Sequence, residues 1–412
     1  MGRPWWERRP AASSSPLKLT TGKQELAAGR RSHLCSHLCS HTGRARVELP
    51  PLPYPVNALA PISDPALDAL FLPFSGGALR WPQAPVLFLR ARDGAALRQF
   101  DLLQLVCEQS FKPFADELVQ GGLQVVADAD TAPAQDRYPL VLVLPPRQRD
   151  EARALFARAV SLAAPGGIVV ASITNNEGAK SGEGDLKQLA GLGGSLTKHH
   201  CRTFWTRPLD SSHDAALHAQ WSKLDAPRPI LDGRFHSRPG VFAWDRIDPA
   251  SALLAEHLPP TLSGHGGDLG AGFGYLSAEV LARCPGVQAL DLYEAEARAL
   301  DLARRNLQNH GTKAELEYRW HDVTAGLPQR YDFIVSNPPF HTQSRADRPD
   351  IGRRFIAVAA ESLKSGGRLW LVANRHLPYE QTLDAGFGQV RVVGERDGFK
   401  VIEAVKATTS RR

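Results

Sequence analysis

The chain has little cysteine, almost no methionine and no long apolar run. Its 412 residues include five cysteines and one methionine, Met1. The cysteines are scattered and odd in number, which is typical of a reduced cytosolic protein rather than of a disulfide framework. No stretch approaches the roughly 18 consecutive apolar residues of a membrane span, and the first residues lack the apolar core of a secretory signal. We therefore expect a cytoplasmic protein with no membrane partner.

The excess positive charge lies at the amino end. Residues 1–55 hold nine Lys or Arg against three acids, which accounts for the whole formal net charge of +6. Any binding of RNA or DNA by the remainder must therefore depend on local basic patches. Residues 1–55 lack apolar periodicity and are predicted to form a disordered basic tail. Because Met1 has no internal alternative, a non-methionine start near residue 56 would make this tail a start-site artefact. The alternating His and Cys of residues 32–41 lack zinc-site spacing, so no metal centre is expected.

The rest of the chain divides into two halves, residues 56–230 and 241–412, each of ordinary domain size. In the first half, apolar runs predict strands at 86–89, 125–127, 140–144 and 168–172, with helices at 66–71 and 149–162. In the second half, we expect strands at 287–293, 316–320, 331–335 and 369–374, helices at 249–257, 275–283, 295–308 and 351–363, and a closing hairpin over 390–405. This alternation favours parallel, doubly wound α/β sheets.

The two halves also repeat one another. Residues 138–147, Tyr-Pro-Leu-Val-Leu-Val-Leu-Pro-Pro-Arg, align with residues 331–340, Tyr-Asp-Phe-Ile-Val-Ser-Asn-Pro-Pro-Phe, and a Gly-Gly turn follows in both. The first copy has Leu144 and Arg147 where the second has Asn337 and Phe340, and it lacks a glycine-rich turn. The pattern predicts a duplicated fold whose first copy has lost its chemistry.

The segment Ser336–Phe340 ends its strand abruptly, because two successive prolines can neither donate to a sheet nor enter a helix. This leaves the Asn337 amide and the Pro338 carbonyl at the strand tip, with Phe340 just beyond. Such a set can accept both hydrogens of a planar amino group while the ring stacks on the base that carries it. Taken alone, the segment could equally be a proline turn with an exposed Asn.

A glycine-rich turn precedes this motif. Asp268 is followed by Gly270, Gly272 and Gly274 at the start of a predicted helix, a pattern that lets backbone approach a ligand closely. The dinucleotide fingerprint does not continue at Tyr275, which favours a nucleoside without a pyrophosphate.

Acidic residues end the next two predicted strands. Glu294 can bind a ribose diol with both oxygens, and Asp291 is the alternative for this role. Asp322, at the end of the following strand, can accept a hydrogen bond from an adenine amino group. Each acid taken singly could be a solvated strand-end residue, and their order along the chain favours a site.

Taken in order, these motifs resemble the class I S-adenosylmethionine-dependent methyltransferases, and Asn-Pro-Pro-Phe resembles those that methylate planar amino nitrogens. Residues 56–406 resemble, more narrowly, the bacterial ribosomal RNA small-subunit guanine-N2 methyltransferase family. The resemblance is carried by residues 144–147, 176–181, 337–341, 372–379 and 398–401. One departure is the stretch Ser263–Gly267, Ser-Gly-His-Gly-Gly, where the family has a strongly apolar strand.

The resemblance implies two tandem Rossmann-like methyltransferase domains, the first degenerate, and S-adenosylmethionine as cofactor. It implies N2 of a guanine in 16S rRNA as the target, within the 30S subunit or its precursor, and a monomeric enzyme. The implied catalytic residues are Asn337, Pro338 and Phe340. The implied cofactor residues are Asp268, Gly270, Gly272, Gly274, Glu294, Asp322 and Asn337.

A basic cluster follows the motif, and its arginines are suited to RNA phosphates. These are Arg345, Arg348, Arg353 and Arg354. The target guanine has to be flipped out or single-stranded, because a paired base hides its amine.

Two other interpretations stay open. Another enzyme with the Asn-Pro-Pro-Phe motif could act on a guanine in 23S rRNA, on adenine N6 or on a glutamine side chain. A non-catalytic RNA-binding or ribosome assembly factor could also keep a cofactor pocket, although the intact Gly270, Gly272, Glu294 and Asn337 argue against it.

Overall fold

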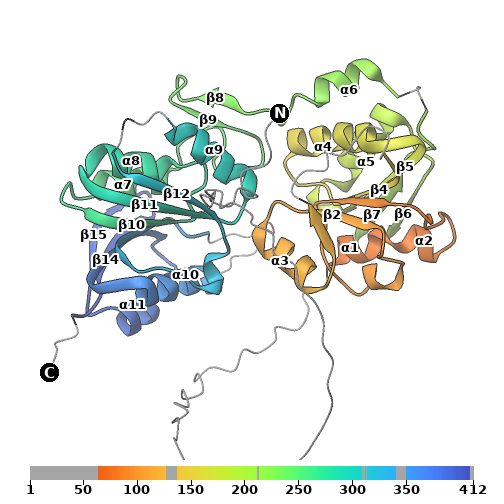
Figure 1. Ribbon diagram of the computed structural model, residues 1–412. Coiled ribbons are helices and arrows are strands. Elements are labelled where there is room, and N and C mark those ends of the chain that lie inside the picture. Colours follow the sequence, from red (N-terminus) through yellow and green to blue (C-terminus); the bar gives the residue numbers. More distant parts are fainter. Residues whose placement is uncertain are drawn as a thin grey trace, which may run out of the picture. The chain divides into compact units, whose positions relative to one another are not determined.

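The computed structural model describes residues 64–126, 137–210, 213–308, 311, 313–339 and 349–408. The predicted tail and its His/Cys repeat lie outside these described residues. The described residues all belong to one compact unit, residues 62–412. This unit contains two seven-stranded sheets with helices on both faces (Figure 1). Both sheets are doubly wound, so the predicted fold class is confirmed.

The first sheet has the strand order β3-β2-β1-β4-β5-β7-β6. Its strands are β1 (Val86–Leu89), β2 (Leu105–Glu108), β3 (Gln124–Val126), β4 (Tyr138–Val143), β5 (Ala163–Thr174), β6 (Gly194–Lys198) and β7 (Cys201–Trp205). One face carries α1 (Pro65–Leu70), α2 (Leu72–Ser75) and α3 (Lys112–Gln120), and the other carries α4 (Arg149–Leu162) and α5 (Ala179–Ala190). Helix α6 (Ala215–Trp221) and the hairpin of β8 (Arg228–Ile230) and β9 (Phe235–Ser237) follow.

The second sheet has the order β12-β11-β10-β13-β14-β16-β15. Its strands are β10 (Ser263–Leu269), β11 (Gly286–Glu294), β12 (Glu315–Trp320), β13 (Tyr331–Ser336), β14 (Leu363–Asn374), β15 (Gln389–Arg396) and β16 (Phe399–Val405). Its helices are α7 (Pro249–His257), α8 (Tyr275–Arg283), α9 (Ala297–Leu307), α10 (Pro349–Ser362) and α11 (Glu380–Gly386). Strands β10 to β14 pair in parallel, and β15 and β16 form the expected antiparallel hairpin.

The two sheets are copies of one plan. Counted within each sheet, both orders read third, second, first, fourth, fifth, seventh, sixth. The pairing of the fourth and fifth strands carries the same irregularity in both copies, a register shift after Tyr138 in the first and after Tyr331 in the second. A shared irregularity at equivalent residues supports duplication more strongly than the shared topology does, because bulges are local features retained from an ancestor.

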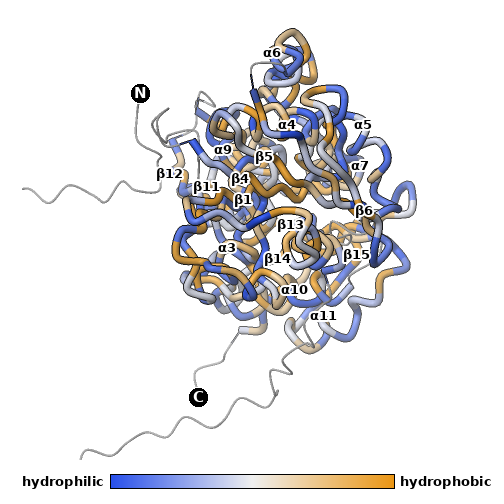
Figure 2. Tube along the Cα trace, turned by 90° about the vertical axis from the view of Figure 1, so that its right-hand side faces the viewer, coloured by the Kyte–Doolittle hydropathy of each residue, from blue (hydrophilic) through white to orange (hydrophobic). Residues whose placement is uncertain are grey.

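The sheets are buried on both faces. In the first sheet, Phe88 and Leu142 pack toward α1, while Leu87 and Val141 pack toward α4. Such strands read as continuous apolar runs, and Figure 2 shows β1, β4 and β5 in the hydrophobic colour. None of the described helices is long and apolar enough to cross a membrane.

The glycine-rich central strand β10 has a packing reason. A Cβ added at Gly266 would lie 2.2 Å from the ring of Phe333 on the neighbouring strand. The aromatic side chain therefore occupies the volume that a side chain on β10 would need. Here the departure of residues 263–267 from an apolar run is compensated by Phe333, so the central strand keeps its place in the sheet.

Candidate active site

The residues that the sequence singled out meet at the carboxyl ends of three adjacent strands. Leu269 of β10 pairs with Tyr293 of β11 on one side and with Ser336 of β13 on the other. The residues that follow these partners, Gly270, Glu294 and Asn337, therefore begin side by side. Strand order reverses between β10 and β13, and open α/β sheets bind ligands at such a switch point.

Each glycine of the turn after β10 has a different requirement. Gly270, Gly272 and Gly274 all have positive φ, at 80°, 55° and 91°. A Cβ at Gly274 would lie 3.2 Å from the Cα of Ala303 in α9, so this glycine permits close packing of the helix. A Cβ at Gly270 would lie 3.9 Å from the carbonyl oxygen of Asn337, whereas one at Gly272 would meet no atom within 4 Å. Gly272 thus borders open space, as the wall of a ligand cradle would.

Glu294 holds this turn from the neighbouring strand. Its Oε2 accepts a hydrogen bond from the backbone N–H of Gly272, and its Oε1 accepts one from the N–H of Glu296, both at 2.8 Å. Burial raises the pKa of Glu294 above its ordinary value. Each carboxylate oxygen can accept a second hydrogen bond, so the residue can serve the turn and a ligand hydroxyl together.

Asp291, the alternative for the ribose role, is engaged inside the domain. Its Oδ1 lies 2.9 Å from His265 Nε2, and its Oδ2 accepts from the Tyr331 hydroxyl at 2.7 Å and from Arg319 Nε at 3.0 Å. With 2% exposure and three internal partners, it is a structural acid. Of the two acids, Glu294 is the one beside the glycine turn.

Asp268 lies beneath the turn and is fully buried. Its Oδ2 accepts from the Ser277 hydroxyl of α8 at 2.7 Å, while its Oδ1 has no hydrogen-bond partner among the described residues. Burial raises the pKa of Asp268 to about 7. A buried oxygen without a partner calls for an explanation, and a ligand group reaching through the turn would provide one.

Asp322 stands at the end of β12, where it caps the short turn Val323–Ala325. Its Oδ1 accepts from the backbone N–H of Thr324 at 2.8 Å. The Thr324 hydroxyl also lies within 2.8 Å of both carboxylate oxygens. These contacts fix the carboxylate at the same sheet edge as Glu294.

The amide of Asn337 is held by two residues that the sequence reasoning missed. Its Nδ2 donates to Asp248 Oδ2 at 2.9 Å and to Ser251 Oγ at 2.8 Å. Both amide hydrogens are thereby engaged, and Oδ1 is left as the acceptor. Asp248 precedes Pro249 at the start of α7, which is a recognisable helix-cap signal. A contact with a residue 89 positions away, however, leaves no signal in a single sequence.

Other predicted residues are distributed as follows. Phe340, Arg345 and Arg348 lie outside the described residues. Pro338 is buried next to Asn337, and Arg353 lies partly buried on α10. Arg354 donates to the carbonyl of Thr324 at 2.9 Å and to Glu361 at 3.0 Å, so it ties α10 to the turn that Asp322 caps.

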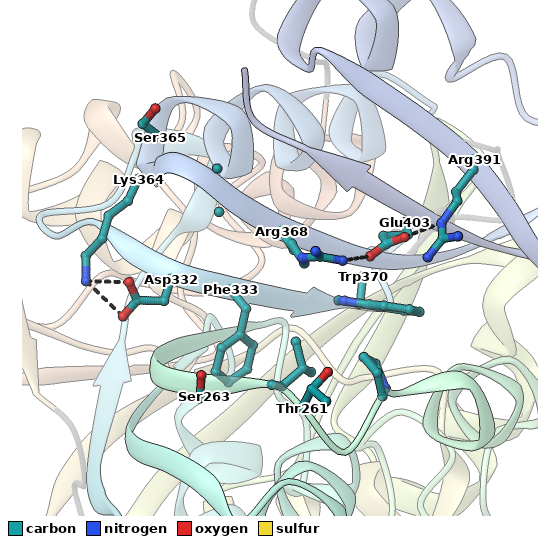
Figure 3. A pocket seen from close by; sticks show the side chains of 14 residues that line it. Thr261, Ser263, Asp332, Phe333, Lys364, Ser365, Arg368, Trp370, Arg391 and Glu403 are labelled. Carbon is teal, nitrogen blue, oxygen red and sulfur yellow. Dashed lines mark hydrogen bonds and ion pairs between the residues drawn. The ribbon is translucent and has the colours of Figure 1, made fainter. Parts of the chain in front are cut away.

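A pocket of about 580 Å³ lies at the opposite, amino-terminal edge of the second sheet (Figure 3). Its charged groups are paired with one another, Lys364 with Asp332, and Arg368 and Arg391 with Glu403. This pocket is therefore not the candidate site. Within the described part of the chain, no three His, Cys, Asp or Glu side chains gather in a way that could hold a metal ion.

Comparison with known proteins places the chain in a family. The family model "Methyltransferase small domain" matches residues 232–403. A Ribosomal RNA small subunit methyltransferase C from Salmonella choleraesuis is 30% identical over 329 residues, which cover 80% of this chain and 90% of that protein. The chain belongs to the ribosomal RNA small subunit methyltransferase C family.

A second relative agrees with this assignment, and a solved structure has the same fold. The protein of that name from Shewanella sp. (strain MR-4) is 33% identical over 271 residues, 65% of this chain and 78% of that protein. A T. thermophilus 16S rRNA N2 guanine methyltransferase, solved with AdoMet and guanosine, matches with a TM-score of 0.68 at 24% identity. That match covers 84% of this chain and 92% of the solved one, and it establishes the fold.

In the first copy, other side chains stand at the positions equivalent to the candidate site residues of the second. The pairing register of β1 with β4 and of β10 with β13 superposes Phe88 on Asp268 and Arg90 on Gly270. The alignment of the strand ends also places Leu144, which is 1% exposed, at the position of Asn337. The ring of Phe88 thus replaces the acid Asp268, and the guanidinium of Arg90 replaces the turn glycine Gly270. The aliphatic side chain of Leu144 replaces the amide of Asn337.

Gln109 replaces Glu294 in the first copy and closes the corresponding turn. Its Oε1 accepts from the N–H of Phe111 at 2.9 Å, as Glu294 accepts from Glu296. Its Nε2, however, donates to the carbonyl of Ala91 at 2.6 Å. The Gln109 amide therefore donates to a carbonyl of its turn, whereas the Glu294 carboxylate accepts from an N–H of its own turn. The Nε2 end of Gln109 offers no acceptor to a ligand hydroxyl.

The first copy also contacts the carboxyl edge of the second sheet, where the candidate site lies. Lys112 N–H donates to the Ala295 carbonyl at 2.8 Å, and Ala297 N–H donates to the Ser110 carbonyl at 2.9 Å. Trp320 Nε1 donates to the same Ser110 carbonyl at 2.9 Å. The turn that follows Glu294 is thus fixed from both copies.

Proposed function

We propose that this protein is an enzyme that uses S-adenosylmethionine to methylate the exocyclic N2 amine of a guanine in 16S ribosomal RNA. One observation carries the proposal: both hydrogens of the Asn337 amide are engaged by Asp248 and Ser251, which leaves Oδ1 as an acceptor on a residue whose backbone carbonyl borders Gly270. Membership of the methyltransferase C family supports the same activity.

The described residues fit this cofactor. S-adenosylmethionine supplies an electrophilic methyl group attached to a sulfonium. In the proposal, the backbone of Gly270, Gly272 and Gly274 forms the cradle, and the open space beside Gly272 is consistent with it. Glu294 accepts from the ribose hydroxyls, Asp322 accepts from the adenine amino group, and the unpartnered Oδ1 of Asp268 is available to a cationic group of the ligand.

The target amine is held by the tip of β13. Asn337 Oδ1 and the Pro338 carbonyl accept its two hydrogens, which leaves the nitrogen lone pair directed at the methyl group. No strong base is required, because the proton can leave as the new bond forms. Phe340 stacks on the base, and preorganised acceptors of this kind stabilise the charge that develops on the nitrogen.

The RNA is proposed to be bound in its single-stranded or flipped state. Arg345, Arg348, Arg353 and Arg354 contact its phosphates in this proposal. We further propose that the substrate is the 30S subunit or its precursor, that the enzyme acts as a monomer, and that it works in the cytoplasm.

Replacing Asn337 by Ala tests the proposed function. With 16S rRNA from a strain lacking the activity, Asn337→Ala should lower kcat by roughly 10²–10³-fold, the usual effect of removing one preorganised hydrogen-bonding group. Asn175→Ala is the control, because Asn175 is an exposed Asn at the end of a strand in the first copy. Methylated guanines are mapped by mass spectrometry in both 16S and 23S rRNA. A variant that methylates at the wild-type rate, or a product found only in 23S rRNA, would refute the proposal.

A further inference from the structure

We propose that Asp248 is a positioning residue that fixes which end of the Asn337 amide faces the target, and that it thereby restricts the site to bases bearing an amino group. The inference deepens the proposed function and rests on it. It depends on the contacts at the start of α7, which place one carboxylate oxygen between a helix terminus and the tip of β13.

The geometry gives Asp248 two tasks at once. Its Oδ2 accepts from the backbone N–H of Ser251 at 2.8 Å, which caps α7, and from Asn337 Nδ2 at 2.9 Å. Ser251, which is 8% exposed, places its hydroxyl 2.8 Å from the same Nδ2. Asp248 is thus the N-cap of α7 and a hydrogen-bond partner of the proposed catalytic amide.

Asp248 and Ser251 differ in which end of the Asn337 amide they can bind. A carboxylate only accepts, so Asp248 requires the NH2 end of Asn337 to face it. A serine hydroxyl can donate or accept, so Ser251 tolerates either end. Asp248 therefore decides the orientation.

The orientation of the Asn337 amide determines which base the site can bind. With Oδ1 toward the target, the site offers an acceptor to an amino group. A flipped amide would set its oxygen against the Asp248 carboxylate and present an NH2 group to the target amine, where donor would face donor. The same flipped amide would suit a base that carries an acceptor at that position. Asp248 thus acts on specificity through Asn337, without touching the base.

Capping alone does not explain this arrangement. Asp214 caps α6 by accepting from the N–H of Leu217 at 2.8 Å. Ser, Thr, Asn and Asp all cap helices well, so α7 would be capped equally by a serine. Only a longer acceptor reaches Asn337 as well. Asp214 therefore provides a control in which capping is the whole role.

The test compares Asp248→Ser with Asp214→Ser in the full-length protein. Serine keeps the cap in both but is too short to hold the Asn337 amide. We expect Asp248→Ser to lower kcat by about 10–100-fold, because misplacing a reacting group costs a comparable factor. The Kd for S-adenosylmethionine should stay within about twofold of the wild-type value, whereas Asp214→Ser should change neither constant. Asp248→Asn, which keeps an acceptor at the same reach, should recover most of the rate.

A second measurement separates orientation from loss of structure. RNA carrying inosine at the target lacks the 2-amino group, so wild-type enzyme should bind the guanine form about tenfold more tightly, as expected for one or two hydrogen bonds. In Asp248→Ser this preference should fall toward one. Wild-type kcat in Asp248→Ser, loss of cofactor binding, or equal weakening for guanine and inosine would each overturn the inference. If Asn337→Ala is also fully active, the proposed function itself fails instead.

Discussion

The substitution Gly272→Ala adds one methyl group, and it should weaken cofactor binding far more than it lowers the stability of the fold. Gly272 has φ at 55°, and a Cβ there would meet no protein atom within 4 Å. Alanine tolerates this backbone conformation at a cost of roughly 1–2 kcal/mol. The N–H that donates to Glu294 at 2.8 Å is retained in the variant. The fold should therefore lose little, while the new methyl enters the space in which we place the cofactor.

The expected loss of affinity follows from the cost of overpacking. One extra methyl in a filled site costs about 2 kcal/mol, which corresponds to a roughly 30-fold weaker Kd. At a cofactor concentration of about 100 times the wild-type Kd, binding stabilises the wild-type fold by about 2.7 kcal/mol. The same concentration would stabilise Gly272→Ala by about 0.9 kcal/mol. For a domain of this size the cofactor-induced rise in Tm should then fall from roughly 5–11 °C to roughly 2–4 °C.

The assay is thermal unfolding with and without S-adenosylmethionine, together with calorimetric titration. Gly77→Ala is the matched control, because Gly77 has φ at 75° and equally open surroundings in the first copy. Gly77→Ala should lose stability through the strained backbone, while its affinity for S-adenosylmethionine should stay at the wild-type value. Gly274→Ala should behave in the opposite way, since its Cβ would lie 3.2 Å from the Ala303 backbone and disturb the packing of α9. Wild-type affinity in Gly272→Ala would show that the cofactor does not occupy this cradle.

Two further predictions concern the acids beneath and beside the turn. Burial raises the pKa of Asp268 to about 7, against about 3.9 in an unfolded chain, so its stabilising contribution is complete below about pH 4 and is lost as pH rises through 7. Relative to Asp268→Asn, the free energy of unfolding of the wild type, measured in urea, should therefore fall by on the order of 1 kcal/mol per pH unit between pH 4 and 7. If the two proteins show the same dependence of stability on pH, the raised pKa of Asp268 is refuted. Asp291→Asn should destabilise the fold by about 3 kcal/mol, because it weakens a buried charge network, whereas Glu294→Gln should weaken cofactor binding by roughly 10–100-fold. Urea unfolding curves and calorimetric titrations with S-adenosylmethionine test both variants. Weaker cofactor binding in Asp291→Asn, with loss of stability in Glu294→Gln, would assign the ribose to Asp291.

Much of the architecture was accessible from sequence because it depends on local patterns. The continuous apolar run of β4, the capped helix α7 from Pro249 to His257, and α8 from Tyr275 to Arg283 were predicted close to their observed bounds. The elements that were missed are short or polar, such as β2, the hairpin of β6 and β7, and the amphipathic α3 and α5. Their burial depends on partners distant in the chain, and a single sequence does not show those partners.

By itself, the sequence determined that two copies of a doubly wound sheet are present and that acids, glycines and Asn-Pro-Pro-Phe end the strands of the second. These follow from periodicity, prolines and spacing, which act over a few residues. Only the tertiary structure decided that Glu294 rather than Asp291 contacts the glycine turn, that Gln109 donates to the equivalent turn of the first copy, and that Asp248 accepts a hydrogen bond from Asn337. The physical reason is that a hydrogen bond between side chains far apart in the chain depends on how the strands pair and how the helices dock.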